Sequence, residues 1–187
     1  MDKQQRLLSS AHDLFLKQGF KSTNIAEIAA AADVAVGTFY NFYDSKTAIF
    51  LQVYNSENER VKANIISKLD LNAAPLLLVK KLVQEIIEQS KDNLILQEWF
   101  TNPKLNLLIS KTNKNAVEES LIYTTFIKLV DSWRNRDLIA PGMTKERILS
   151  LFNALTVVDF HQSEIATDDY FQLLDDLITG ILKVILK

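Results

Sequence analysis

Residues 23–46 read TNIAEIAAAADVAVGTFYNFYDSK, and this stretch decides the fold of the chain. Residues 22–24 are all of types that cap helix N-termini. The apolar side chains of residues 25–32 recur at helical spacing, which predicts a short helix. Aspartate tolerates a positive φ better than most residues, so the segment Ala32-Asp33-Val34 predicts a tight turn after that helix.

Residues 34–43, which follow the turn, fit two interpretations. Their apolar and hydroxylated side chains alternate as in a strand, and β-branched and aromatic residues favour that structure. Residues 36, 39, 40 and 43 equally define one face of a helix. No second strand candidate exists elsewhere to pair with a strand here, and a lone strand leaves its backbone polar groups unsatisfied. We therefore expect a second short helix, which completes a helix-turn-helix.

The remaining sequence predicts helices throughout. Residues 4–18 form an amphipathic helix that should end at Gly19, where a positive φ costs little. Only four glycines and three prolines interrupt the chain. Further helices are expected over residues 45–68, 75–89, 92–101, 103–110, 115–135, 144–161 and from 168 to the C-terminus. The expected fold class is all-α, with a three-helix domain over residues 1–48 that contains the helix-turn-helix, a motif used by many DNA-binding proteins, and a larger helical bundle over residues 49–187.

Composition excludes several classes of protein. The chain has no cysteine, two histidines and no glycine-rich phosphate loop, so we expect no enzyme, no metal site and no cofactor. The N-terminus lacks the apolar core of a signal sequence, and no apolar run approaches the roughly 20 residues of a membrane span, which predicts a cytoplasmic protein without a membrane part. The formal net charge is −2, and acidic and basic residues balance in the first 50 residues. If the helix-turn-helix binds DNA, the absence of net positive charge in these first 50 residues predicts a modest affinity.

The helix-turn-helix stretch resembles the tetracycline-repressor (TetR) family. Residues 23–29, residues 32–40 and the pair Tyr43 and Lys46 agree with the family in order and spacing. The resemblance covers roughly residues 5–52. It implies a transcription regulator that binds double-stranded DNA through the second short helix.

The resemblance also assigns the DNA contacts. The expected DNA-binding residues are Thr23, Val36, Gly37, Thr38, Tyr40, Asn41, Tyr43 and Lys46. Hydroxyl, phenol and ammonium groups of this set would contact phosphate oxygens. Residues 36, 37 and 41 would lie close to base edges, where asparagine pairs with adenine and a valine methyl touches thymine.

Two residues depart from the family pattern. Asp33 stands where the family usually has a glycine in the turn, and Ala35 stands where a serine usually caps the second helix. Loss of such a cap costs about 1 kcal/mol. We therefore expect a less rigid recognition helix without the phosphate contact that is usual at position 35.

The C-terminal part predicts a dimer. Apolar side chains line two faces of residues 168–186, so this helix needs a partner beyond its own domain, and a second subunit is the economical one. Residues 115–135 are similarly apolar. The resemblance implies a homodimer joined by a four-helix bundle, and we expect helices 115–135 and 168–186 to form it. Two-fold symmetry then predicts a palindromic operator.

A site for a small hydrophobic effector is expected in the C-terminal part, because members of the family often hold an apolar pocket there. Aromatic side chains with a few polar groups suit such a pocket. The expected lining residues are Trp99, Phe100, Tyr123, Phe126, Phe152, Asn153, Asp159 and His161. Ordinary core packing is the alternative for each of them.

These expectations combine into a repressor that a small-molecule effector releases from its palindromic operator. The effector would act by shifting helix 45–68, which follows the motif directly, and coupling of about 1–3 kcal/mol is enough. The alternative is a helical dimeric interaction protein with a degenerate DNA-binding head, which the neutral head charge and Ala35 favour.

Overall fold

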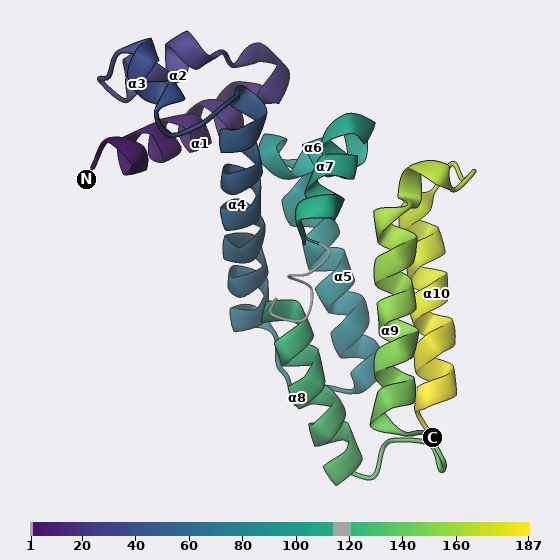
Figure 1. Ribbon diagram of the computed structural model, residues 1–187. Coiled ribbons are helices and arrows are strands. Elements are labelled where there is room, and N and C mark those ends of the chain that lie inside the picture. Colours follow the sequence, from purple (N-terminus) through teal and green to yellow (C-terminus); the bar gives the residue numbers. More distant parts are fainter. Residues whose placement is uncertain (1, 114–120) are drawn as a thin grey trace. The chain divides into compact units, whose positions relative to one another are not determined.

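A computed structural model describes residues 2–113 and 121–187, and helices dominate these residues (Figure 1). The expected all-α class is confirmed. The chain divides into two compact units, one made of Met1–Val61 with Glu88–Ile109 and the other of Lys62–Ile87 with Ser110–Lys187. Three helices, α4 (Lys46–Lys68), α5 (Pro75–Lys91) and α7 (Pro103–Asn113), contribute residues to both units.

Helix α1 spans Lys3–Ser22 and contains a break near its end. Asp2 caps its N-terminus by accepting a hydrogen bond from a backbone N–H of the first turn at 2.8 Å. At Gly19 φ is 76° and the helical backbone is interrupted, as expected, and a short helical segment then continues to Ser22. The rings of Phe15 and Phe20 lie on either side of the break with centroids 5.9 Å apart.

The next two helices are α2 (Ile25–Ala31) and α3 (Val36–Tyr40). Of the capping candidates before α2, Asn24 is the cap, and its side chain accepts a hydrogen bond from the third residue of the helix at 2.9 Å. Asp33 has a φ of 53°, which confirms the tight turn. Residues 36–40 are helical, so the strand interpretation is wrong, although the side chain of Ala35 provides no cap.

Residues 2–61, called the head below, have an apolar core to which α1, α2, α3 and α4 all contribute. Its fully buried side chains include Leu7, Ala11, Phe15, Ile28, Phe39, Ile49 and Phe50. The rings of Phe15 and Phe50 meet edge to face with centroids 5.1 Å apart. Helices as short as α2 and α3 are unstable alone, so this shared burial keeps them folded.

A buried carboxylate, Glu57 of α4, ties helices of the first unit together. Its side chain is only 1% exposed. It accepts hydrogen bonds from Arg60 at 2.7 Å, from Nε2 of His12 in α1 at 3.1 Å, and from Nδ2 of Asn93. Asn93 in turn caps α6 (Leu94–Thr101) with its side-chain oxygen. We call these four residues the Glu57 cluster.

The donors of the Glu57 cluster determine the charge state of its carboxylate. Arg60 contributes most, and with His12 and Asn93 it outweighs the opposing effect of burial, which lowers the pKa of Glu57 to about 2. A buried charge is tolerated only when it is paired and hydrogen-bonded. The cluster therefore holds α1, α4 and the start of α6 together through hydrogen bonds to one buried charge.

Beyond α6, helix α7 spans Pro103–Asn113.

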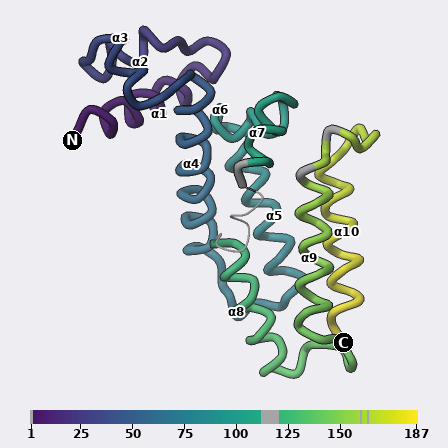
Figure 2. Tube along the Cα trace, in the orientation of Figure 1, coloured from purple at the N-terminus to yellow at the C-terminus, as the bar shows by residue number. Residues whose placement is uncertain are grey.

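Three α-helices of the second unit follow residue 120. They are α8 (Leu121–Asn135), α9 (Lys145–Phe160) and α10 (Tyr170–Ile185). α9 and α10 run side by side, with the short 3-10 helix Gln162–Glu164 between them in sequence (Figures 1 and 2). Thr144 caps α9 as expected, whereas Asp169 caps α10 in place of the expected Asp168.

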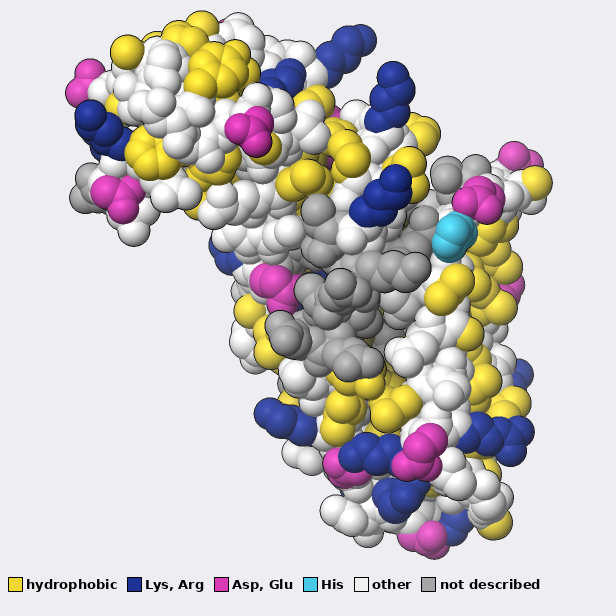
Figure 3. Space-filling model, viewed as in Figure 1, with side chains coloured by type: hydrophobic (Ala, Val, Ile, Leu, Met, Phe, Trp, Pro, Cys, Tyr) yellow, Lys and Arg dark blue, Asp and Glu magenta, His cyan; other side chains and the backbone are white. Residues whose placement is uncertain are grey.

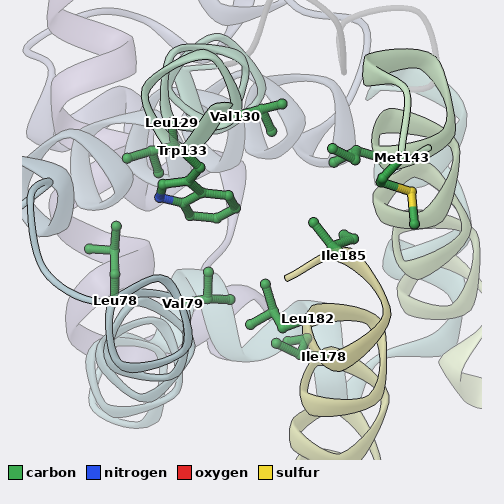
Figure 4. Close-up of a cluster of buried hydrophobic side chains, with 10 residues drawn as sticks. Leu78, Val79, Leu129, Val130, Trp133, Met143, Ile178, Leu182 and Ile185 are labelled. Carbon is green, nitrogen blue, oxygen red and sulfur yellow. The ribbon is translucent and has the colours of Figure 1, made fainter. Parts of the chain in front are cut away.

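Trp133 of α8 is fully buried in the core of the second unit. Figure 4 shows its indole facing the apolar side chains that α5 and α10 contribute. The buried members are Leu78, Val79, Leu129, Val130, Trp133, Met143, Ile148, Ile178, Leu182 and Ile185. At the edge of this core an ion pair joins Lys80 to Asp175 at 2.9 Å. The C-terminal half of the apolar stripe of α8 is therefore covered within its own unit, whereas Leu121 at the start of the helix is 36% exposed.

Replacing Leu182 by alanine should lower the free energy of unfolding by about 2–5 kcal/mol, because the cavity it leaves lies in a closely packed core. The measurement is urea denaturation followed by circular dichroism. Lys183→Ala, an exposed change on the same helix, is the control and should alter stability by about 0.5 kcal/mol or less. Equal effects of the two changes would contradict the packing described for α10.

The Glu57 cluster predicts a specific dependence of stability on pH. The folded-state pKa of about 2 lies below the ordinary 4.5, so the ionised carboxylate stabilises the fold above pH 4.5 and the stabilisation is lost as the pH falls towards 2. A depression of this size corresponds to on the order of 3 kcal/mol. Denaturation over a pH series should show that loss in the wild type and in Glu59→Gln, an exposed control, but not in Glu57→Gln. An unchanged pH dependence in Glu57→Gln would overturn the assignment.

Candidate nucleic-acid interface

The turn between α2 and α3 is fixed by backbone hydrogen bonds. The N–H of Asp33 donates to the carbonyl of Ala30, and the N–H of Val34 donates to that of Ala29, both at 3.0 Å. These hydrogen bonds terminate α2 and turn the backbone towards the start of α3. The two short helices therefore form the helix-turn-helix that the sequence predicts.

Helix α3 has one buried side and one exposed side. Phe39 is fully buried and anchors the helix in the core of the head. Val36 and Tyr40 are 43% and 54% exposed, and Gly37 and Asn41 are exposed as well. Thr38 is half-buried. Five of the eight expected DNA-binding residues thus lie together on α3 and its C-terminal end.

The other three expected residues point their polar groups into the protein. Thr23 is 1% exposed, and its hydroxyl donates a hydrogen bond to the carbonyl of Gly19 at 2.8 Å. The ammonium of Lys46 donates to the carbonyls of Phe20 and Thr23, at 2.7 Å each, and lies 4.2 Å from the centre of the Phe20 ring. Desolvation by burial lowers the pKa of Lys46, while Glu98 and Glu27 oppose that effect.

Tyr43 also belongs to the inner side of the head. Its side chain is 6% exposed, and its ring lies 5.7 Å from that of Phe39. Burial raises the pKa of its phenol, so the group stays neutral. Tyr43 thus supports the buried anchor of α3.

The surface next to α3 contains residues that the sequence analysis did not single out. Phe42 is 41% exposed, immediately after the helix. Arg6 reaches the almost fully exposed Asp33 of the turn at 3.5 Å. The sequence could have predicted the exposure of Phe42, because position 42 does not belong to the helical face that positions 36, 39, 40 and 43 define. No local pattern predicts the pairing of Arg6 with Asp33.

The expected effector residues fall in different units. Trp99 is buried in α6, and Phe100 is 37% exposed there. In the second unit the rings of Phe126 and Phe152 pack with centroids 4.0 Å apart, and Tyr123 is half-buried.

The polar members of the expected effector set are engaged elsewhere or exposed. Asp159 accepts a hydrogen bond from the hydroxyl of Tyr170 at 3.0 Å, and burial beside this carboxylate raises the pKa of Tyr170. His161 is exposed and pairs with Glu164 at 2.8 Å, and Asn153 is exposed. Within the second unit, the structure brings together Phe126 and Phe152 of this set but gives the polar groups other partners.

Two other features are absent from the described part of the chain. No group of three or more His, Asp or Glu side chains among residues 2–113 and 121–187 could hold a metal ion. In the same ranges no helix has the length and apolarity needed to cross a membrane.

Comparisons with known proteins agree with the geometry of the head. Residues 7–53 match the family model described as bacterial regulatory proteins, tetR family. The transcriptional repressor KstR of Mycobacterium tuberculosis is 24% identical over 127 residues, which cover 68% of this chain and 58% of KstR. The repressor DhaR of a Mycobacterium species is 32% identical over 85 residues, which cover 45% of this chain and 43% of DhaR. The chain thus spans about half the length of these curated relatives.

A solved structure extends the likeness to the whole fold. FadR of Thermus thermophilus, described as a TetR-family transcriptional repressor in complex with lauroyl-CoA, superimposes with a TM-score of 0.64 over 98% of this chain and 95% of that one, at 21% identity. At this identity the likeness shows the fold alone. These relatives are regulators, in line with the expectation that the chain is not an enzyme. The resemblance that the sequence predicts is thus confirmed: residues 7–53 match the tetR family of bacterial regulatory proteins, and the whole chain shares the fold of a TetR-family structure.

Proposed function

We propose that this chain is a DNA-binding transcriptional repressor that holds a palindromic operator as a homodimer and is released by a small hydrophobic effector. The observation that carries the proposal is the exposed side of α3, a short helix anchored by Phe39. A helix presented in this way fits the major groove, which is about 12 Å wide. Such a repressor acts in the cytoplasm, where bacterial DNA lies.

The proposed contacts follow from the chemistry of the exposed groups. Asn41 offers an amide that pairs with adenine, and Val36 offers methyl groups for thymine. Gly37 allows the backbone of α3 to approach the DNA closely. The hydroxyls of Thr38 and Tyr40 would donate to phosphate oxygens and so fix the position of the head.

Thr23, Tyr43 and Lys46 have a supporting role in this proposal. Their polar groups face the interior of the head, and two of them satisfy carbonyl groups around the end of α1. A phosphate contact from Thr23 or Lys46 requires that the side chain exchange these internal hydrogen bonds for the phosphate. We therefore expect these three residues to position α3 and contribute less to direct binding than Tyr40 does.

The proposed dimer rests on the last two helices. The buried residues of α8, Leu129, Val130 and Trp133, lie in the core of their own unit. By contrast, Val157 of α9 and Val184 of α10 are 58% and 52% exposed. Exposed apolar side chains on adjacent helices favour burial against a second copy. Two such helix pairs would make a four-helix bundle. Of the expected interface over residues 115–135, positions 115–120 lie outside the described residues.

For the effector we propose a small hydrophobic compound. The aromatic groups around Phe126 and Phe152 supply apolar surface in the second unit. FadR of Thermus thermophilus, which shares the fold, is named in complex with lauroyl-CoA. Because α4 contributes to both units and holds Glu57, we propose that effector binding changes the position of α4 and releases the DNA.

The test of DNA binding is fluorescence anisotropy with a duplex selected by this protein from a random library. Tyr40→Ala should weaken specific binding about 10- to 100-fold, which corresponds to the loss of a contact of about 1–3 kcal/mol. Tyr40→Phe is the matched control: it keeps the ring, removes the hydroxyl, and should lose affinity to a smaller extent. Both variants should unfold at the temperature of the wild type, since Tyr40 is half exposed.

Selection of no sequence by the wild type, even at low salt, would refute the repressor proposal. The interaction protein with a degenerate head would then be the better description, since it dimerises but shows no sequence preference.

The double change Val157→Glu and Val184→Glu should shift the protein from dimer to monomer, because it introduces four negative charges into the proposed two-fold interface. Analytical ultracentrifugation across a concentration series measures the dissociation constant, which should rise at least about 10-fold. Lys183→Glu, also exposed on α10, is the control for added charge. A double variant with the dissociation constant of the control would place the interface elsewhere.

A further inference from the structure

The surface around α3 is unusually apolar for a protein surface that faces DNA. In residues 2–61 four large hydrophobic side chains are recorded as exposed, and three of them, Val36, Tyr40 and Phe42, lie within seven residues of each other. Figure 3 shows hydrophobic side chains, in yellow, over the part of the surface that the N-terminal helices form, with several charged side chains, in dark blue and magenta, among and around them. Exposed apolar groups clustered in this way are typical of an interaction surface.

The backbone holds Phe42 in a defined place. Its N–H donates to the carbonyl of Phe39 at 3.0 Å, and the N–H of Tyr43 donates to the same carbonyl at 3.0 Å. Phe39 and Tyr43 are both buried, so the residue between these anchors cannot turn inward without breaking them. The ring of Phe42 is therefore presented at the C-terminal end of the recognition helix by a fixed turn.

Positive charge is scarce on this surface. Residues 33–45 contain no lysine or arginine, and their charged residues are Asp33 and Asp44. Of the neighbouring cations, Arg6 is paired with Asp33, and the ammonium of Lys46 is bound to two carbonyl oxygens. Attraction to phosphates therefore contributes little at this segment, and favourable contacts must come from hydrogen bonds and apolar groups.

In the major groove the apolar group that a protein can touch is the C5-methyl of thymine. We propose that Phe42 is a specificity-determining residue that, in addition to Val36, contacts thymine methyl groups in the operator half-site. The inference rests on the proposed function and deepens it, since it assigns the chemical basis of sequence choice. The half-site is expected to contain thymines at the positions that Phe42 and Val36 reach.

The test replaces single thymines of the selected duplex by deoxyuridine, which removes the methyl group and keeps the base pair. At one or two positions in each half-site the wild type should lose about three- to tenfold in affinity, as expected for loss of one buried methyl per half-site. Phe42→Ala should bind the original duplex more weakly by a similar or larger factor. It should lose nothing further at the deoxyuridine position next to Phe42.

Two further variants keep the result interpretable. Phe42→Leu retains an apolar side chain and should keep part of the sensitivity to the methyl group. Leu16→Ala removes an exposed apolar side chain on α1 and should leave affinity and methyl sensitivity unchanged. Thermal unfolding of each variant checks that the head remains folded.

The outcomes separate this inference from the proposed function. A wild type that selects a sequence but binds thymine and deoxyuridine duplexes equally would overturn the thymine contact and leave the repressor proposal standing. Equal methyl sensitivity in Phe42→Ala and the wild type would overturn the role of Phe42. A wild type that selects no sequence would overturn both proposals together.

Discussion

The candidate interface depends on the burial of Phe39. Helix α3 has five residues, too few to pay for its own nucleation, and its N-terminal residue Ala35 supplies no side-chain cap. Insertion of the Phe39 ring into the core compensates for both deficits, because a fully buried aromatic side chain contributes about 1.5–3 kcal/mol. Tyr43 packs beside that ring and extends the support. The buried rings of Phe39 and Tyr43 thus hold the exposed side of α3 in place.

A second constraint acts through polar groups. Lys46 and Thr23 satisfy carbonyl groups around the break in α1, which would otherwise lack partners where the helix is interrupted at Gly19. Glu57 connects α1 to α4 and to the cap of α6. Movement of any one of these helices against the others must break hydrogen bonds to a buried charge, which is costly. A few specific polar contacts thus hold α1, α4 and the start of α6 together, in addition to the apolar core of the head.

Much of the fold could be predicted because its signals are local. Helical spacing of apolar residues, the cap at Thr144 and the aspartate turn at Asp33 all act within a few residues, and the structure confirms them. The Glu57 cluster could not be predicted, since His12 and Asn93 lie 45 and 36 residues away from Glu57 in sequence. The inward orientation of Thr23 and Lys46 depends on the path of the chain around Gly19, which spacing alone does not describe. The exposed set on α3 followed from the helical face, but the exposure of Phe42 depends on the turn that follows the helix.

The sharing of α4 between the two compact units limits how this protein can be taken apart. A fragment that ends at residue 48 would contain the whole helix-turn-helix but would leave His12 without Glu57, and Leu7 and Phe15 without the apolar residues of α4 beyond that point. Transplanting the DNA-recognition function onto another regulator would therefore require a larger cassette, with residues up to 61 and a substitute for the segment 88–109. The helix-turn-helix thus ends well before the compact unit that contains it, and a chimera joined directly after the motif would lack part of that unit's core.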